Sequence, residues 1–300
     1  MATHAGAFEL NEPIPELTKP RLVMALSPWI DVGAVGSGTL NFLEQAWDSQ
    51  PLAQLARPGD FFDFTRYRPI LRRQDGVREI DLPNTYLRHA RDANGGDWIF
   101  MHGLEPHNRA EDYLESIMDI TQRFGVAENL LIGSFYGPAP HTRPPVVYGE
   151  ASDEAALQRL RNSGAQSSSY EGPTTVLALA TEQAYSQGIE TTRMILQLPA
   201  YAQLEQDYRG LQKMLELLAD FYGLSLDLSH VRDEATRQLA MINEAVDADS
   251  RLQRWVQEME TAYDAAAAPE SNGEPTPLLS PELEEFLREA QRPMDDQESA

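Results

Sequence analysis

Short apolar runs alternate with helical patterns along residues 20–223 of this 300-residue chain, and this alternation limits the possible folds more than any other feature. Runs typical of buried strands include Leu22–Leu26, Asp97–Gly103 and Asn129–Tyr136. Between the last two, Ala110–Phe124 places its apolar side chains at helical spacing. Strands separated by helices usually pair in parallel through right-handed crossovers. The sequence therefore predicts an α/β fold, a three-layer α/β/α sandwich with a mostly parallel central sheet.

Other segments extend this pattern. The aromatic run Phe61–Phe64 and the alternating run Gly76–Pro83 predict two more strands, and Thr192–Leu198 predicts another. Helices are predicted at Thr174–Gln187 and Leu211–Tyr222, and a glycine that can end the helix follows each one.

After the last of these helices the pattern becomes wholly helical. Residues 229–263 carry two apolar stripes, separated by a break at Asp247–Ser250, which predicts a C-terminal helical hairpin. The stretch SPELEEFLREA, from Ser280 to Ala290, predicts a short amphipathic helix. A helix this short is marginal alone, so we expect its apolar face to bind a partner. The expected partner-binding residues of this tail helix are Leu283, Phe286 and Leu287.

These patterns divide the chain into four parts. Residues 1–20 are polar and contain several prolines, so we expect an N-terminal arm. Residues 21–228 are expected to form the α/β/α domain and residues 229–265 the helical hairpin. Residues 266–300 are expected to form an acidic linker with the short terminal helix.

The charge and composition exclude several classes of protein. The formal net charge is −23, and such an acidic surface repels phosphate backbones, so we expect no nucleic-acid partner. The chain has no cysteine, which excludes disulfides, thiolate metal sites and a cysteine nucleophile. No apolar run approaches the roughly 20 residues that span a bilayer, and the N-terminus does not resemble a secretory signal. We therefore expect a cytoplasmic protein with no membrane association.

Polar side chains gather where predicted strands end, and the segment PAPHTRPP, which contains His141 and Arg143, is the densest example. A catalytic histidine needs a nucleophile and an orienting group, and no serine of the chain lies in a G-x-S-x-G elbow. Arg143 could grip a carboxylate in a bidentate pair, with Glu105 or Asp31 as candidate partners. The surrounding prolines fix several backbone angles. We therefore favour a structural role for His141 and Arg143, in which they hold this loop in place.

Two further motifs have functional interpretations that we find weaker than the structural ones. In HGLEPH, two imidazoles and Glu105 could hold a metal, but the spacing matches no standard site, so a strand-to-helix loop is favoured. The glycines Gly33, Gly36 and Gly38 have the order G-x-x-G-x-G rather than that of a dinucleotide fingerprint. We interpret them as positions where a helix packs closely on the sheet. We expect no metal and no cofactor.

Taken in order, the segments LSPWIDVGAVG, FFDFTRYRP, DWIFMHGLEPH, PAPHTRPPVVYGEAS, SYEGPTTV, QGIET and LPAY resemble the proteasome assembly chaperone family. The likeness covers roughly residues 20–245 and is strongest to the prokaryotic, actinobacterial-type branch with a helical C-terminal extension. The resemblance implies a phosphorylase/hydrolase-like fold and binding to other protein subunits, since eukaryotic members chaperone assembly of the proteasome α-ring. Some archaeal relatives form rings and bind proteasomes through a tail that ends in a hydrophobic residue, tyrosine and any residue. This sequence ends in DDQESA instead.

Two hypotheses of function remain open on the sequence. The favoured one is a non-enzymatic chaperone or scaffold that forms a homo-oligomer, such as a trimer, and binds other protein subunits, proteasome-related ones among them. The alternative is a small-molecule hydrolase or phosphorylase-like enzyme that uses the C-terminal edge of the sheet. Its candidate pocket would be formed by Asp31, Arg68, Glu105, His141, Arg143 and Tyr170.

Overall fold

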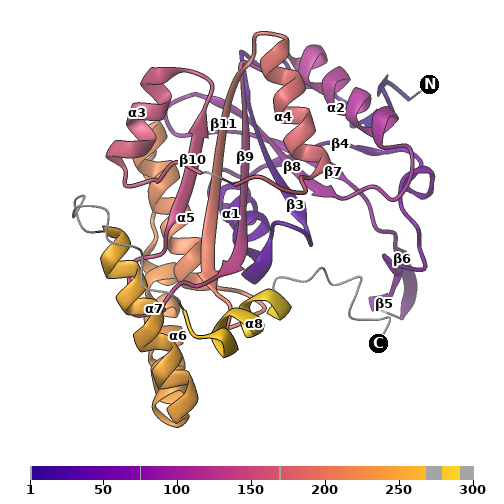
Figure 1. The fold of residues 1–300 in the computed structure, drawn as a ribbon. Coiled ribbons are helices and arrows are strands. Elements are labelled where there is room, and N and C mark those ends of the chain that lie inside the picture. Colours follow the sequence, from indigo (N-terminus) through magenta and orange to yellow (C-terminus); the bar gives the residue numbers. More distant parts are fainter. Residues whose placement is uncertain (1, 75, 169, 268–278, 291–300) are drawn as a thin grey trace.

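The computed structural model describes residues 2–74, 76–168, 170–267 and 279–290, and its centre is a nine-stranded mixed sheet (Figure 1). The strand order is β1-β2-β4-β7-β8-β3-β9-β11-β10. Parallel pairing is confined to the four neighbouring strands β8, β3, β9 and β11, and the other pairs are antiparallel. The strands are β1 (His4–Ala5), β2 (Phe8–Leu10), β3 (Arg21–Ser27), β4 (Gln50–Leu55), β7 (Tyr86–Arg91), β8 (Asp97–Leu104), β9 (Glu128–Gly137), β10 (Val147–Ala151) and β11 (Glu190–Pro199). The predicted α/β class is confirmed, but the sheet is mixed rather than mostly parallel.

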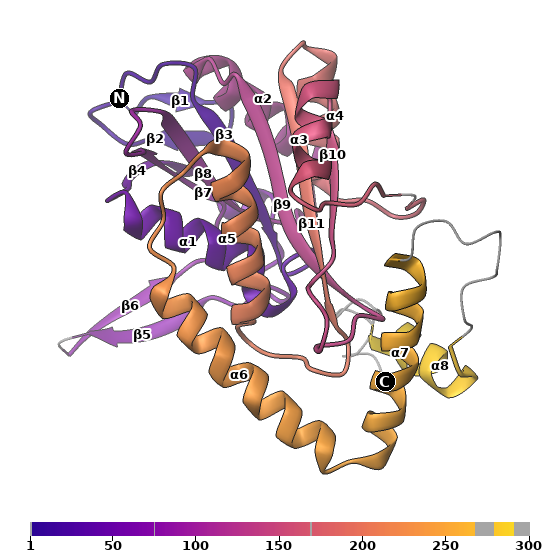
Figure 2. The same ribbon diagram turned by 90° about the vertical axis from the view of Figure 1, so that its left-hand side faces the viewer.

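Helices cover both faces of the sheet (Figures 1 and 2). On one face lie α1 (Val35–Ala46), α3 (Glu154–Asn162) and α5 (Tyr208–Tyr222), and on the other α2 (Ala110–Phe124) and α4 (Val176–Ser186). Strand β3 shows why both faces need cover, because Val23 and Ala25 belong to the first apolar cluster whereas Leu22, Met24 and Leu26 belong to the second. A central strand that is buried on both faces reads as a continuous apolar run.

Two expectations for the N-terminal third are corrected. Residues 1–20 are not a separate arm, because β1 and β2 lie within them and β2 pairs with β4 of the main sheet. The segment Phe61–Phe64 is not a strand and follows a short 3-10 turn, Pro58–Asp60. Phe61 and Phe62 are buried and pack edge-on against Tyr113 of α2. The aromatic run therefore marks a core-filling loop.

The predicted strand Gly76–Pro83 is present as β6 (Val77–Asp81), which pairs only with β5 (Ile70–Gln74). This two-stranded hairpin, named here the β-arm, is separate from the main sheet. Figure 2 shows it projecting from the side of the molecule that α1 and α5 cover.

The predicted helical hairpin is formed by α6 (Ser229–Asp247) and α7 (Ser250–Ala267), and the side chain of Asp249 accepts backbone hydrogen bonds at the start of α7. The tail helix α8 (Pro281–Ala290) packs on this hairpin, and the two elements form a third apolar cluster with the end of β11 (Figure 2). Within the described ranges, no helix has both the length and the apolar character that crossing a membrane requires.

Candidate functional site

The predicted pocket residues follow different strands and do not share one set of contacts. Glu105 follows β8, Asp31 follows β3 and His141 follows β9, and these strands are neighbours spaced roughly 4.8 Å apart. The three residues are therefore spread along the rim of the sheet. Arg68 and Tyr170 lie in two other loops and are exposed.

Asp31 is buried between β3 and the start of α1. Its carboxylate accepts hydrogen bonds from the Ser27 hydroxyl at 2.7 Å and from the Ser37 backbone N–H at 3.0 Å. A side chain at Gly36 would meet both Asp31 and Ala25 of β3, at 3.0 and 3.1 Å. Close helix packing was the interpretation given to the glycines of this segment, and at Gly36 it is confirmed. Asp31 thus holds the start of α1 on the sheet.

Glu105 serves a similar purpose on the opposite face. Its carboxylate accepts a hydrogen bond at 3.0 Å from the backbone N–H of Val176, the first residue of α4. Burial raises the pKa of Glu105, and this hydrogen bond opposes the shift. Neither Glu105 nor Asp31 pairs with Arg143, so both candidate partners predicted for that arginine are wrong.

The other side chains of HGLEPH also have separate partners. His102 bonds to Glu44 of α1 at 2.7 Å, and the ring of His107 packs against Tyr67 at 4.6 Å. The Tyr170 hydroxyl, in a different loop, donates to the Pro173 carbonyl. These contacts are consistent with the interpretation of HGLEPH as a strand-to-helix loop.

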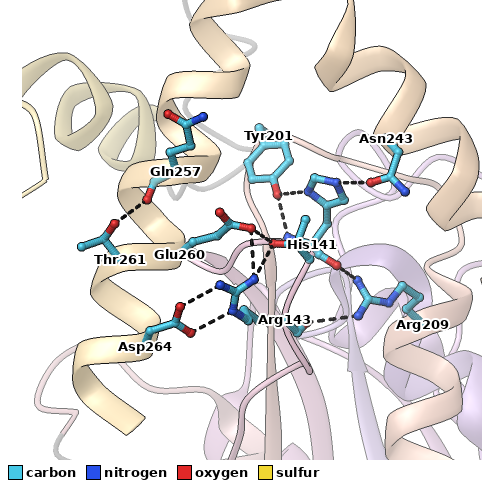
Figure 3. Close-up of polar contacts among 10 residues, drawn as sticks. His141, Arg143, Tyr201, Arg209, Asn243, Gln257, Glu260, Thr261 and Asp264 are labelled. Carbon is cyan, nitrogen blue, oxygen red and sulfur yellow. Dashed lines mark hydrogen bonds and ion pairs between the residues drawn. The ribbon is translucent and has the colours of Figure 1, made fainter. Parts of the chain in front are cut away.

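The segment that does form a site is the proline-rich loop, residues 138–146, which connects β9 to β10 and contacts the helical hairpin (Figure 3). His141 is 2% exposed and lies between Tyr201 and Asn243 of α6. Its Nε2 bonds to Asn243 Oδ1 at 2.9 Å and its Nδ1 to the Tyr201 hydroxyl at 2.5 Å. A carbonyl oxygen only accepts, so Nε2 carries the proton and Nδ1 accepts from Tyr201.

This arrangement satisfies a neutral imidazole. Burial lowers the pKa of His141, and the hydrogen bond to Asn243 opposes the shift. Burial also raises the pKa of the Tyr201 hydroxyl, so this group stays protonated and donates. Because both ring nitrogens are used by structural partners, His141 is not positioned to accept a proton from a substrate.

Arg143 joins the proline-rich loop to α7. Its guanidinium makes a bidentate pair with Asp264, at 2.8 and 2.7 Å, and a further contact with Glu260 at 3.1 Å. The hydrogen bonds and charges of these carboxylates raise the pKa of Arg143. The predicted bidentate grip is present, but its carboxylates come from α7, and the Asp264 side chain is 55% exposed.

The backbone of the same loop is held from α5. Arg209 donates to the carbonyls of both His141 and Arg143. Arg209 is half-buried, and burial lowers its pKa. Pro144 accepts a hydrogen bond from Tyr263 of α7 at 3.2 Å. The loop is therefore fixed by side chains from three helices, α5, α6 and α7.

The tail helix α8 packs against α7 of the same hairpin. Leu283 and Leu287 are buried, and the ring of Phe286 lies 4.8 Å from that of Trp255 in α7. The apolar face expected to meet a partner is thus covered by this chain itself. The acidic C-terminal residues 291–300, including the sequence DDQESA, lie outside the described residues.

Sequence reasoning missed the residues that complete the site: Tyr201, Arg209, Asn243, Glu260 and Asp264. Two signals were available. Tyr201 ends the segment LPAY, and Glu260 and Asp264 are four residues apart on one face of a helix. Neither signal states which loop these side chains contact.

A sequence model of the PAC2 family matches residues 25–246. No curated protein matches the chain. Among solved structures, a Corynebacterium glutamicum protein of unknown function is 23% identical, with a TM-score of 0.78 over 86% of this chain and 97% of that one. A Mycobacterium tuberculosis protein of unknown function is 25% identical, with a TM-score of 0.76 over 88% of this chain and 90% of that one.

A Mycobacterium tuberculosis proteasome-assembly chaperone homologue is 24% identical, with a TM-score of 0.70 over 79% of this chain and 99% of that one. These likenesses agree with the fold described above. The family match spans well over half of the sequence, from the end of β3 to the end of α6. The predicted family relationship is therefore confirmed: the chain belongs to the PAC2 family.

Proposed function

We propose that this protein is a cytoplasmic, non-enzymatic chaperone or scaffold that self-associates and binds other protein subunits, proteasome-related subunits among them. Membership of the PAC2 family and the likeness to a proteasome-assembly chaperone homologue support a chaperone-like role. The helices on both faces of the sheet agree with the phosphorylase/hydrolase-like three-layer fold that we propose for the α/β part.

The observation that carries the proposal is the structural role of the proline-rich loop, which contains both His141 and Arg143. The side chains of these two residues bond to four others. His141 bonds to Tyr201 and Asn243, and Arg143 bonds to Glu260 and Asp264, so these contacts hold the helical hairpin against the body. A hydrolase needs a nucleophile, a base and an oxyanion donor around one reacting atom. The six residues of the alternative pocket are distributed over separate contacts, so they do not supply such a set.

The experiment mixes the purified full-length protein with purified proteasome α-subunits from Mycobacterium tuberculosis and follows complexes by native mass spectrometry. We expect a complex of the two chains, or faster appearance of assembled α-rings, at micromolar concentrations. An unrelated folded protein of similar net charge controls for non-specific attraction to an acidic surface.

Absence of any complex, together with ester or nucleoside hydrolysis that His141→Ala abolishes, would replace this proposal with the enzymatic alternative. Absence of a complex without hydrolysis would still remove the proteasome subunits from the proposal.

A further inference from the structure

The tail helix α8 lies on a surface of this chain that is built to receive a helix (Figure 2). Leu283 and Leu287 are 0 and 6% exposed there, and the ring of Phe286 lies beside that of Trp255. Apolar residues at positions i, i+3 and i+4 are the pattern by which an amphipathic helix binds an apolar surface. The residues that receive them, named here the α8-binding surface, are Ala200, Val246, Trp255, Val256 and Met259.

One polar contact at the edge of this surface favours a single direction for a bound helix. The Glu258 side chain of α7 accepts a hydrogen bond at 3.1 Å from the backbone N–H of Ser280, the residue before α8. Any helix that begins at the same place presents a backbone N–H and the positive end of its dipole to this carboxylate. Glu258 can therefore bind the start of another helix as it binds that of α8.

The charges of α8 do not complement those of the helical hairpin. Residues 229–267 carry eight acidic and four basic side chains, and α8 adds four acidic residues and one arginine. Acidic side chains remain in excess when Arg143, which binds two of them from the proline-rich loop, is included. Glu282, Glu284 and Glu285 of α8 are exposed. Because like charges repel most at low ionic strength, α8 is held by its apolar face against an unfavourable charge.

We propose that the α8-binding surface binds a basic amphipathic helix of a partner subunit, which displaces α8. Such a helix makes the apolar contacts of α8 with residues at i, i+3 and i+4, and its outer basic side chains meet the acidic excess of the hairpin. The net charge of −23 also attracts a basic segment to the whole molecule and repels an acidic one. In this arrangement α8 covers Trp255 and Met259 until the partner binds.

The first test measures the binding of fluorescent peptides to the full-length chain by anisotropy. One peptide has the native sequence of residues 279–290, and a second carries Glu282→Lys, Glu284→Lys and Glu285→Lys. We expect the basic peptide to bind about tenfold more tightly than the native one at about 0.05 M NaCl. This advantage should largely disappear at about 0.5 M NaCl, because salt screens the charges.

The matched control separates the proposed site from general attraction to an acidic protein. It is a third peptide that keeps the three lysines and replaces Leu283, Phe286 and Leu287 with asparagine. Its charge equals that of the basic peptide, so a difference between the two reports the apolar contacts. We expect the control to bind at least about tenfold more weakly.

The second test locates the bound peptide. The natural sequence has no cysteine, so Glu284→Cys gives a single site for a spin label on α8. The basic peptide should make this label mobile and leave a label on Glu111→Cys, an exposed position of α2, unchanged. In a Leu287→Ala chain α8 docks less tightly, so both the native and the basic peptide should bind at least about tenfold more tightly than to the wild type.

The outcomes separate this inference from the proposed function, on which it rests because it names the segment of a bound subunit. Binding of the basic peptide that leaves the label at position 284 immobile would overturn it, since the peptide would then lie elsewhere. Tighter binding of the native peptide would also overturn it and would indicate α8 of a second copy as the occupant. A complex with proteasome α-subunits that leaves this label immobile would keep the proposed function and remove this site from it.

Discussion

Arg143 is the residue that connects the α/β body to the C-terminal helices. Its bidentate pair with Asp264 and its contact with Glu260 cross 121 and 117 positions of sequence. Lysine can reproduce the charge of such a pair but not the fork geometry that places two parallel hydrogen bonds on one carboxylate. The joint therefore depends on the residue type as well as on the charge.

Replacing Arg143 with alanine should loosen α7 without unfolding the body. We expect faster amide hydrogen exchange along residues 250–267, and a Tm of the body that stays within about 2 °C, because a segment held by a few polar contacts can open locally without unfolding the core. Arg143→Lys should give an intermediate exchange rate. Arg161, whose side chain pairs with Glu154 of its own helix at 3.5 Å, provides the matched control. Unchanged exchange in α7 would show that apolar packing alone holds the hairpin.

His141 gives the joint a pH dependence. The neutral imidazole is favoured in the folded state, so its folded pKa lies below the unfolded value of 6.5. The unfolded chain then binds more protons as the pH falls, and stability decreases with it. The contribution of His141 is complete above about pH 6.5 and is lost as the pH falls through the folded pKa.

We expect His141→Gln to reduce stability at pH 8 by about 1–3 kcal/mol, because Tyr201 and Asn243 lose well-placed partners. The same variant should lose less stability than the wild type between about pH 6.5 and pH 5, because glutamine does not titrate. Urea unfolding at several pH values measures both effects. His230→Gln, at an exposed position of α6, controls for the substitution itself. Equal slopes in wild type and His141→Gln would contradict the assignment.

At the scale of elements, α6, α7 and α8 form a unit with its own apolar cluster. Val246, Trp255, Val256 and Met259 receive Leu283 and Leu287 from α8. The family match ends at residue 246, so α7 and α8 lie beyond it. The unit is joined to the body by the polar contacts of the proline-rich loop and by the packing of α5 against α6.

Removing one apolar side chain of α8 should release this helix. Leu287→Ala is expected to weaken docking of α8 by about 2–5 kcal/mol, the usual cost of truncating a buried leucine. A spin label on Glu284→Cys, at an exposed position of the same helix, reports the release as increased mobility. Glu285→Ala removes an exposed side chain and should leave the label spectrum unchanged. An immobile label in Leu287→Ala would show that other contacts hold α8.

The parallel strands and the long helices were predictable because their residues are buried in regular patterns. Strand β3 is continuously apolar, and α2 and α5 repeat apolar residues at helical spacing and end at glycines. The antiparallel strands β4 and β7 were missed because they are short and mostly polar. In β4, QPLAQL, and β7, YLRHAR, only half or fewer of the residues face a core.

At the scale of the whole molecule, the candidate site shows the limit of local patterns. The sequence indicated that Arg143 would grip a carboxylate and that His141 would brace its loop, since charge and proline content determine these tendencies. It did not indicate α7 as the partner, because the crossing of a loop with a helix more than a hundred residues away is decided by tertiary packing. Asp31 and Glu105 do follow the ends of strands, but they follow two different strands, β3 and β8, and bond to different helices.

The covered face of α7 has a consequence for any molecule that competes for it. Because α8 belongs to the same chain as the surface on which it lies, its effective concentration there is on the order of millimolar. A free helix of equal intrinsic affinity would need a comparable concentration to occupy half of the molecules. Only a ligand that binds much more tightly than α8 itself, or that is delivered at high local abundance, can displace it.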